Sequence, residues 1–217
     1  NDNFYKCHLS INENKIKNCE QIDSKTYSKL ISESGRHKIT DNFKSFPINL
    51  GSFNNEMPIV WLEDESNEFK MNKKGTYYFI KQNKKNEDLN FIFQNSEAKL
   101  FIQGNFENVN FKFIKDFENQ NKKFDEVRYD KNLLTGCVNF FDSYFNEVSL
   151  ISSNMICEDS INIKNSEGNL NKIDISNSFF DALDLDFSKI TIKNLKVDNA
   201  KNDCADFSFG EYKIVQA

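Results

Sequence analysis

The chain has 217 residues, 38% of them hydrophobic, and 22 phenylalanines dominate its aromatic content. This hydrophobic share lies below the roughly 45–50% of ordinary globular domains and favours an elongated repeat, in which each turn buries only a thin layer. The formal net charge of −5 comes with no basic stripe, which argues against nucleic-acid binding, and no apolar run reaches the ~18 residues of a membrane span.

Residues 1–58 are predicted to form an irregular N-terminal segment that caps the domain, because they are polar and lack strand-like alternation. Within them, residues 23–34 are predicted to form a short capping helix, with Asp23 or Ser24 as its N-cap and a glycine directly after it. A helix in front of a stack of strands would cover the unpaired end of the sheet.

From residue 59 the hydrophobic period changes to two, and short runs rich in Phe, Tyr and Ile alternate with Asn, Lys and Glu. The run Leu89–Phe93 recurs as Val109–Phe113, twenty residues later, which indicates an internal repeat. Residues 115–132 interrupt the pattern and are predicted to form a polar loop. The predicted strands of this region are Thr76–Ile80, Leu89–Gln94, Lys99–Gln103 and Val109–Ile114.

The repeat becomes regular towards the C-terminus. Asp159–Ile163 matches Asp181–Leu185 and then Asp203–Phe207, each time after 22 residues, and Gly136–Phe140 precedes them by 23. A fixed period of this length predicts an all-β fold, a right-handed parallel β-helix over residues 59–217 with about six or seven turns. The competing fold, a β-sandwich, also has many short strands but no fixed period.

Two apolar columns explain why this repeat would fold as a coil. In successive turns about 4.8 Å apart, residues at the same position stack into continuous ladders. The last turn ends with Phe207 and Ile214 uncovered, so we expect further turns or a cap beyond residue 217, or end-to-end stacking with another copy. The columns are Val138, Ile161, Leu183 and Ala205, and Phe140, Ile163, Leu185 and Phe207.

Four segments follow one another in these turns: 134–143 (LTGCVNFFDS), 158–162 (EDSIN), 180–188 (FDALDLDFS) and 202–208 (NDCADFS). The series resembles the right-handed β-helix domain of bacterial surface and exported proteins, the type that occurs beside spore-coat-kinase-like and lamin-tail modules. The resemblance covers roughly residues 130–210. It implies the β-helix fold and an exported location (periplasmic, cell-surface or secreted), and it implies no activity. Cys204 and Ala205 stand where this family pattern has Gly-Ile, and Phe209 where a Gly often follows.

Alternation places two polar columns on the outside of the predicted turns. The first is interpreted as amide stacking that also keeps the surface soluble. The second lies at the strand entrances, where Asp accepts hydrogen bonds from backbone N–H groups two residues on and so fixes a corner. The first column is Asn139, Asn162, Asp184 and Asp206, and the second is Asp159, Asp181 and Asp203.

Asp184, Asp186 and Asp206 carry two further hypotheses. Like charges one turn apart raise one pKa unless a cation lies between them, and calcium prefers oxygen clusters of this kind; no other cofactor is expected. Alternatively, Asp184 and Asp206 are the acid and the base or nucleophile of a polysaccharide-active enzyme (a hydrolase, lyase or epimerase), since carboxylates about 5 Å apart suit a retaining mechanism. The usual accessory groups are missing, because no His lies near this column and no Arg follows Arg128.

The five cysteines give a mixed signal. Cys7 and Cys19, twelve residues apart, are a candidate disulfide of an exported protein. Cys137 and Cys204 are predicted to share an outward column, but they lie three turns apart, roughly 14 Å at the 4.8 Å spacing, which is too far for a disulfide. The redox state of these two and of Cys157 stays open.

The absence of a complete catalytic set, a phosphate loop or a zinc-ligand spacing favours a non-enzymatic function. We expect a structural or binding module of a bacterial envelope or surface assembly, which binds a protein or a glycan along the extended polar faces of the coil.

Overall fold

The computed structural model of the chain describes residues 4–10, 15–23, 25, 45–48, 59–62, 66–116 and 134–217. Its first three strands are β1 (Phe4–Ser10), β2 (Lys15–Ile22) and β3 (Ser45–Ile48), which pair antiparallel in the order β2-β1-β3. They differ from the irregular segment predicted here, because the apolar residues of β2 (Ile16, Cys19 and Ile22) lie three positions apart and do not show strand-like alternation. Of the predicted helix over 23–34, only Asp23 and Lys25 are described, Lys25 with helical backbone; the rest lies outside the described residues.

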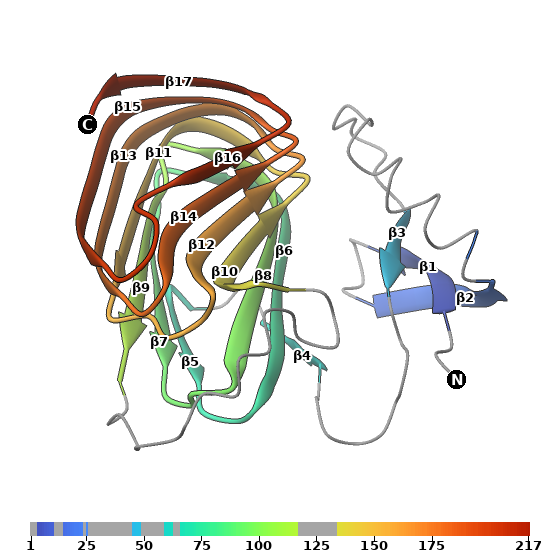
Figure 1. Ribbon diagram of the computed structural model, residues 1–217. Coiled ribbons are helices and arrows are strands. Elements are labelled where there is room, and N and C mark those ends of the chain that lie inside the picture. The colour runs from blue at the N-terminus through green and yellow to red at the C-terminus, as the bar shows by residue number, and fades with distance from the viewer. Residues whose placement is uncertain are drawn as a thin grey trace.

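The described residues from 59 to 217 form a parallel β-helix of about six turns, as the repeat predicts. All pairings between their strands are parallel, and Figure 1 shows the layers rising from β4 and β5 to β16 and β17. From residue 117 on, the predicted polar loop lies outside the described part of the chain. The strands are β4 (Ile59–Trp61), β5 (Glu68–Met71), β6 (Gly75–Lys85), β7 (Asp88–Phe93), β8 (Ala98–Glu107), β9 (Asn110–Lys115), β10 (Gly136–Phe141), β11 (Tyr144–Ser153), β12 (Asp159–Lys164), β13 (Glu167–Ser178), β14 (Asp181–Asp186), β15 (Lys189–Ala200), β16 (Asp206–Ser208) and β17 (Glu211–Gln216).

The pairings divide the wall of the coil into three faces. Face 1 contains β4, the first parts of β6 and β8, and β10, β12, β14 and β16. Face 2 contains the last residues of β6 and β8, the first parts of β11, β13 and β15, and β17. Face 3 contains β5, β7, β9 and the later parts of β11, β13 and β15. The long strands therefore run from one face to the next.

The apolar columns predicted for the inside are confirmed. Phe140 pairs with Ile163, which pairs with Leu185, which pairs with Phe207; Val138 pairs in the same way with Ile161 and then Leu183. Apart from Phe207 in the last turn, these side chains are buried. Each contributes roughly 1.5–3 kcal/mol relative to an exposed side chain.

Phenylalanine fills the inside of the earlier turns. The rings meet edge to face, with centroids 5.3 Å apart for Phe79–Phe91 and for Phe111–Phe140. Such pairs contribute about 0.5–1.5 kcal/mol beyond the area they bury. Large side chains thus compensate for the small number of hydrophobic residues in the chain.

The spacing of the first repeat differs from the prediction. Leu89 pairs with Phe111 and Phe91 pairs with Phe113, so the period is 22 residues here as well, and not the twenty expected from the similarity of the two runs. A shift of two residues leaves every side chain on the same face of a strand, so alternation alone does not detect it.

The corner between faces 3 and 1 is formed by asparagines with left-handed backbone. Asn154, Asn177 and Asn199 have φ values of 60°, 55° and 63°, a conformation that Asn tolerates better than most residues. The Nδ2 atom of Asn177 donates to Oδ1 of Asn154 (3.1 Å), and Asn199 donates likewise to Asn177 (2.9 Å). Amide stacking between turns therefore occurs at this corner.

The last turn contains β16 and β17 and leaves Phe207, Ile214 and Val215 exposed. The expected cover over this last turn, by further turns, a cap or a second copy, stays a prediction. No helix within the described residues is long and apolar enough to cross a membrane.

Candidate functional site

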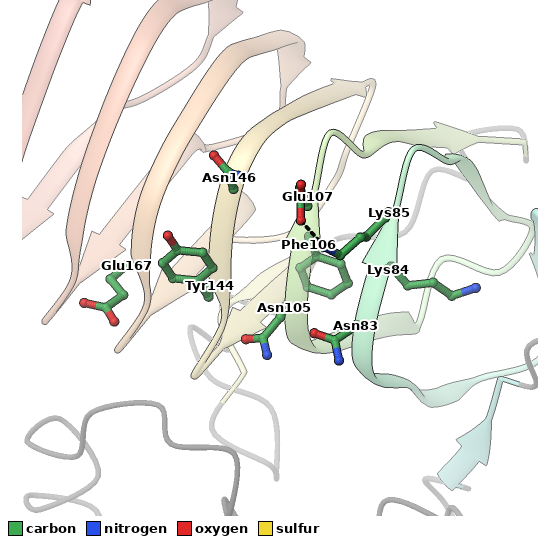
Figure 2. A pocket seen from close by; sticks show the side chains of 9 residues that line it. All are labelled: Asn83, Lys84, Lys85, Asn105, Phe106, Glu107, Tyr144, Asn146 and Glu167. Carbon is green, nitrogen blue, oxygen red and sulfur yellow. Dashed lines mark ion pairs between the residues drawn. The ribbon is translucent and has the colours of Figure 1, made fainter.

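The larger of two candidate grooves, the amide groove, lies on face 2, where β6, β8, β11 and β13 run side by side. Its volume is about 360 Å³. Figure 2 shows Asn83, Asn105, Tyr144 and Glu167 on neighbouring strands. The lining residues are Asn83, Lys84, Lys85, Asn105, Phe106, Glu107, Tyr144, Asn146 and Glu167.

The register of the strands aligns these side chains. Asn83 pairs with Asn105, Asn105 with Tyr144, and Tyr144 with Glu167, so four successive turns contribute one residue each. At a strand spacing of about 4.8 Å this column spans roughly 14 Å along the axis of the coil. The groove therefore runs across the strands and along the axis.

A glycine starts the bend into this groove. Gly104 directly precedes Asn105 and has a φ of 153°, and a Cβ atom added to it would lie 1.9 Å from the carbonyl oxygen of Lys81 on the neighbouring turn. No other residue fits there without moving the strand.

The amide groove presents polar groups whose charges are largely paired. Lys85 forms an ion pair with Glu107, drawn as a dashed line in Figure 2. Lys84 forms another with Glu87, in which Nζ lies 3.0 Å from Oε2. The Tyr144 side chain is 41% exposed. Amides that both donate and accept hydrogen bonds, next to an aromatic ring, suit an uncharged polyhydroxylated ligand.

Sequence reasoning missed the amide groove. Asn83 and Asn105 are 22 residues apart, which is the period of the coil, but Asn105 and Tyr144 are 39 residues apart because of the long insertion between their turns. The period therefore cannot place Tyr144 beside the two asparagines.

The second groove, the acidic groove, lies on the outside of face 1 and has a volume of about 200 Å³. It brings together the three predicted site residues Asp184, Asp186 and Asp206. Asp184 and Asp206 pair directly on adjacent strands, and Asp186 pairs with Lys164 on one side. The lining residues are Thr135, Phe141, Glu158, Asp159, Asn162, Lys164, Asp181, Asp184, Asp186, Asp206 and Ser208.

The predicted exposed polar ladder is wrong for its two asparagines, since Asn139 and Asn162 are buried. The Asn139 side chain folds onto the backbone: its Nδ2 donates to the carbonyls of Gly136 (2.7 Å) and Leu100 (3.1 Å), and its Oδ1 accepts from the Gly136 N–H. Asn162 donates to Oδ2 of Asp184 at 2.7 Å. Only Asp184, half-buried, and Asp206, exposed, remain accessible.

In the column at the strand entrances, Asp181 binds the backbone, but across turns. Oδ1 of Asp181 accepts from the backbone N–H of Asp203 (2.8 Å) and from Nδ2 of Asn202 (2.7 Å). The predicted partner was an N–H two residues on, whereas the observed one lies 22 residues on. Asp159 and Asp181 are buried, and Asp203 is exposed.

Two carboxyl groups of the acidic groove have raised pKa values. Burial raises the pKa of Asp159 to about 7, assisted by the charges of Asp184, Asp181 and Glu158 and opposed by a hydrogen bond from Thr135. Burial and then the charge of Asp186 raise the pKa of Asp184 to about 6, against the hydrogen bond from Asn162. Near neutral pH both groups are able to exchange protons.

A disulfide joins Cys137 to Cys157, which are 20 positions apart in sequence, with Cα atoms 5.3 Å apart. Cys137 was expected to point outward but is buried beside the corner that precedes β12. Cys204 is exposed and forms no disulfide. Cys7 and Cys19 belong to the paired strands β1 and β2, and their disulfide stays a prediction.

No protein-family model matches the chain, and no match was found among curated proteins or solved structures. Within the described ranges, no group of three or more His, Cys, Asp or Glu side chains is arranged to hold a metal ion. The calcium hypothesis for Asp184, Asp186 and Asp206 stays a prediction.

Proposed function

We propose that this protein is a non-catalytic binding module that binds an extended glycan in the amide groove. The observation that carries the proposal is the groove of about 360 Å³ in which three amide side chains adjoin the half-exposed Tyr144 ring. Each amide donates and accepts, as sugar hydroxyls do, and the ring offers an apolar surface on which a sugar ring packs.

The pairings on face 2 favour a polymer over a single sugar. The column continues beyond the groove from Glu167 to Lys189 and Glu211, so six outward positions follow one another. At about 4.8 Å per turn they form a strip roughly 24 Å long. A neighbouring polar column runs through Asn146, Asn169, Thr191 and Lys213.

The proposal includes an exported location, in a bacterial envelope or surface assembly. The Cys137–Cys157 disulfide supports it, because such bonds persist mainly in oxidising compartments.

The test measures binding of soluble neutral and acidic polysaccharides by calorimetry. Tyr144→Ala should weaken binding roughly tenfold, the equivalent of about 1.4 kcal/mol, whereas Tyr144→Phe keeps the ring and most of the affinity. Lys196→Ala, at an exposed position on face 3, is the control and should bind like the wild type. A folded wild-type protein that binds none of the polysaccharides refutes the proposal.

A polysaccharide-active enzyme is the second candidate, favoured by the pairing of Asp184, whose pKa is raised to about 6, with Asp206 on the next strand. Two carboxyl groups on adjacent strands, one of them with a raised pKa, match the acid and the nucleophile of a retaining glycosidase. The test measures release of reducing ends. Cleavage by the wild type that is lost in a folded Asp184→Asn variant would replace the first proposal.

A further inference from the structure

The acidic groove of face 1 is lined by more carboxylates than cations. Six of its lining residues carry a carboxyl group and one, Lys164, carries an ammonium group, whose Nζ lies 3.8 Å from Oδ2 of Asp186. The negative charge of Asp184 contributes to the raised pKa of Asp159. A concave site lined by one sign of charge concentrates the opposite sign.

One carboxylate that lines this groove has an oxygen atom that accepts no hydrogen bond from the described part of the chain. Asp159 is 2% exposed, and within the described residues no donor bonds its Oδ2 atom. A buried acceptor without a donor is unfavourable, and native structures satisfy almost all such groups. Because Asp159 lines the groove, a donor on a bound ligand would satisfy this oxygen.

The rim of the groove carries two exposed phenyl rings. Phe187 and Phe209 directly follow Asp186 and Ser208 of the groove, and their rings stack with centroids 5.3 Å apart. Both have left-handed backbone (φ 49° and 46°), although the same corner uses Asp142 and Asn165 in the two preceding turns. A bulky residue in this conformation is strained, which indicates a function for the rings.

These rings lie where they attract cations. The Nζ atom of Lys164 lies 5.5 Å from the centroid of Phe187 and 6.0 Å from that of Phe141. The groove therefore already holds one ammonium group, from the chain itself, by the contacts that a ligand ammonium would use.

We propose that the acidic groove binds a protonated primary amine, carried by a polyamine or by an amino sugar, with Asp159 and Asp184 as acceptors and Phe187 at its rim. An ammonium group supplies three donors to converging oxygens. An organic cation fits better than a bare metal ion, because the groove is about 200 Å³ in volume and phenyl rings are not metal ligands. This site is separate from the amide groove, so either proposal can fail alone.

The proposal predicts a pH dependence. The acceptors must be ionised, and the pKa values of Asp159 and Asp184 are about 7 and about 6, so affinity should rise as pH increases from 5 to 7. An alkylammonium group of a polyamine keeps its proton throughout this range. The ammonium group of an amino sugar has a lower pKa, because of the neighbouring hydroxyl and acetal oxygens, and loses part of its protonation near pH 7, so its rise in affinity is smaller. The other charged or titratable groups near the two acceptors are Glu158, Lys164, Asp181, Asp186, Asp206 and Tyr212.

The experiment is calorimetry of the full chain with spermidine, with glucosamine oligomers, with N-acetylglucosamine oligomers and with calcium chloride, at pH 7 and pH 5. We expect an amine to bind at pH 7 and to bind at least tenfold more weakly at pH 5. Asp184→Asn should weaken it at least tenfold, since a charge-assisted hydrogen bond is lost. Whichever of spermidine and the glucosamine oligomers binds with the lower Kd identifies the ligand class, a polyamine or an amino sugar.

Three results would overturn the proposal: no binding of either amine, equal binding of the N-acetylated oligomer that Tyr144→Ala leaves unchanged, or calcium binding without amine binding. Asp198→Asn, at an exposed position of face 3, is the matched control and should leave affinity unchanged. Circular dichroism checks folding, and Asp159→Asn tests the same contact independently. Tyr144→Ala should not affect amine binding, which separates this site from the amide groove.

Discussion

The Cys137–Cys157 disulfide should be a large single contribution to the stability of the coil. It closes a loop of 20 residues and ties the corner before β12 to β10, one turn earlier. A crosslink of this length removes chain entropy from the unfolded state worth about 3 kcal/mol at 25 °C. Replacing both cysteines with alanine should therefore lower the free energy of unfolding by about 3 kcal/mol, plus a smaller loss of packing at the buried Cys137.

The assay is urea unfolding, followed by circular dichroism, of wild type and of the double variant Cys137→Ala/Cys157→Ala. For a chain of this length, a loss of about 3 kcal/mol corresponds to a fall in Tm of roughly 6–12 °C. Cys204→Ala is the control, because Cys204 is exposed and forms no disulfide, and its stability should match that of the wild type. A double variant that loses less than about 1 kcal/mol would refute this reasoning.

Three further predictions concern single residues. Leu183→Ala should lower the free energy of unfolding, measured in urea, by about 2–5 kcal/mol. Leu183 is buried in the stacked apolar column, so the substitution leaves a cavity that the neighbouring strands cannot close. A loss below about 1 kcal/mol contradicts the prediction. Asn139→Ala should lower the free energy of unfolding by about 2–3 kcal/mol in the same assay, since the carbonyls of Leu100 and Gly136 lose their donor. A change close to zero, as expected for a surface residue, contradicts the prediction. Burial raises the pKa of Asp142 to about 6, so the stability gained from its protonated form is full below about pH 4 and is lost as pH rises through 6. Asp142→Asn should remove this pH dependence and add roughly 1–3 kcal/mol to the free energy of unfolding at pH 7. If the free energy of unfolding of wild type and variant changes with pH in parallel, this prediction is wrong.

The fold was predictable because a coil repeats its inward positions. Leu185 lies between Ile163 and Phe207 in the structure, as the 22-residue spacing requires, and a single shift of one residue would turn all three outward. The same logic explains the error in the earlier turns. Two residues more or less leave the alternation intact, so the similarity of 89–93 to 109–113 suggested a shorter period than the pairing of Leu89 with Phe111 shows.

The outward side was predicted less well, because alternation says which way a side chain points and not what covers it. Asn139 alternates with the inward residues Val138 and Phe140, as predicted, yet it is buried, and its amide bonds the backbone of its own and the preceding turn. The disulfide escaped prediction for a related reason. Its 20-residue spacing is shorter than the period of the coil, so the two cysteines do not share a column, and a search for partners in one column misses it.

Deviations from the repeat are therefore the most informative part of this sequence. The inward positions accept any apolar residue that fills the turn, and the corner positions favour Asn or Asp because these tolerate left-handed backbone. Phe187 and Phe209 satisfy neither rule: they take the strained corner conformation and still expose their rings to solvent. The stack of Phe187 on Phe209 and the contact of Lys164 with Phe187 offset part of this strain, which Asn165 avoids one turn earlier. Under our proposal these rings have a function, because they follow groove residues Asp186 and Ser208 and would contact an ammonium group bound there.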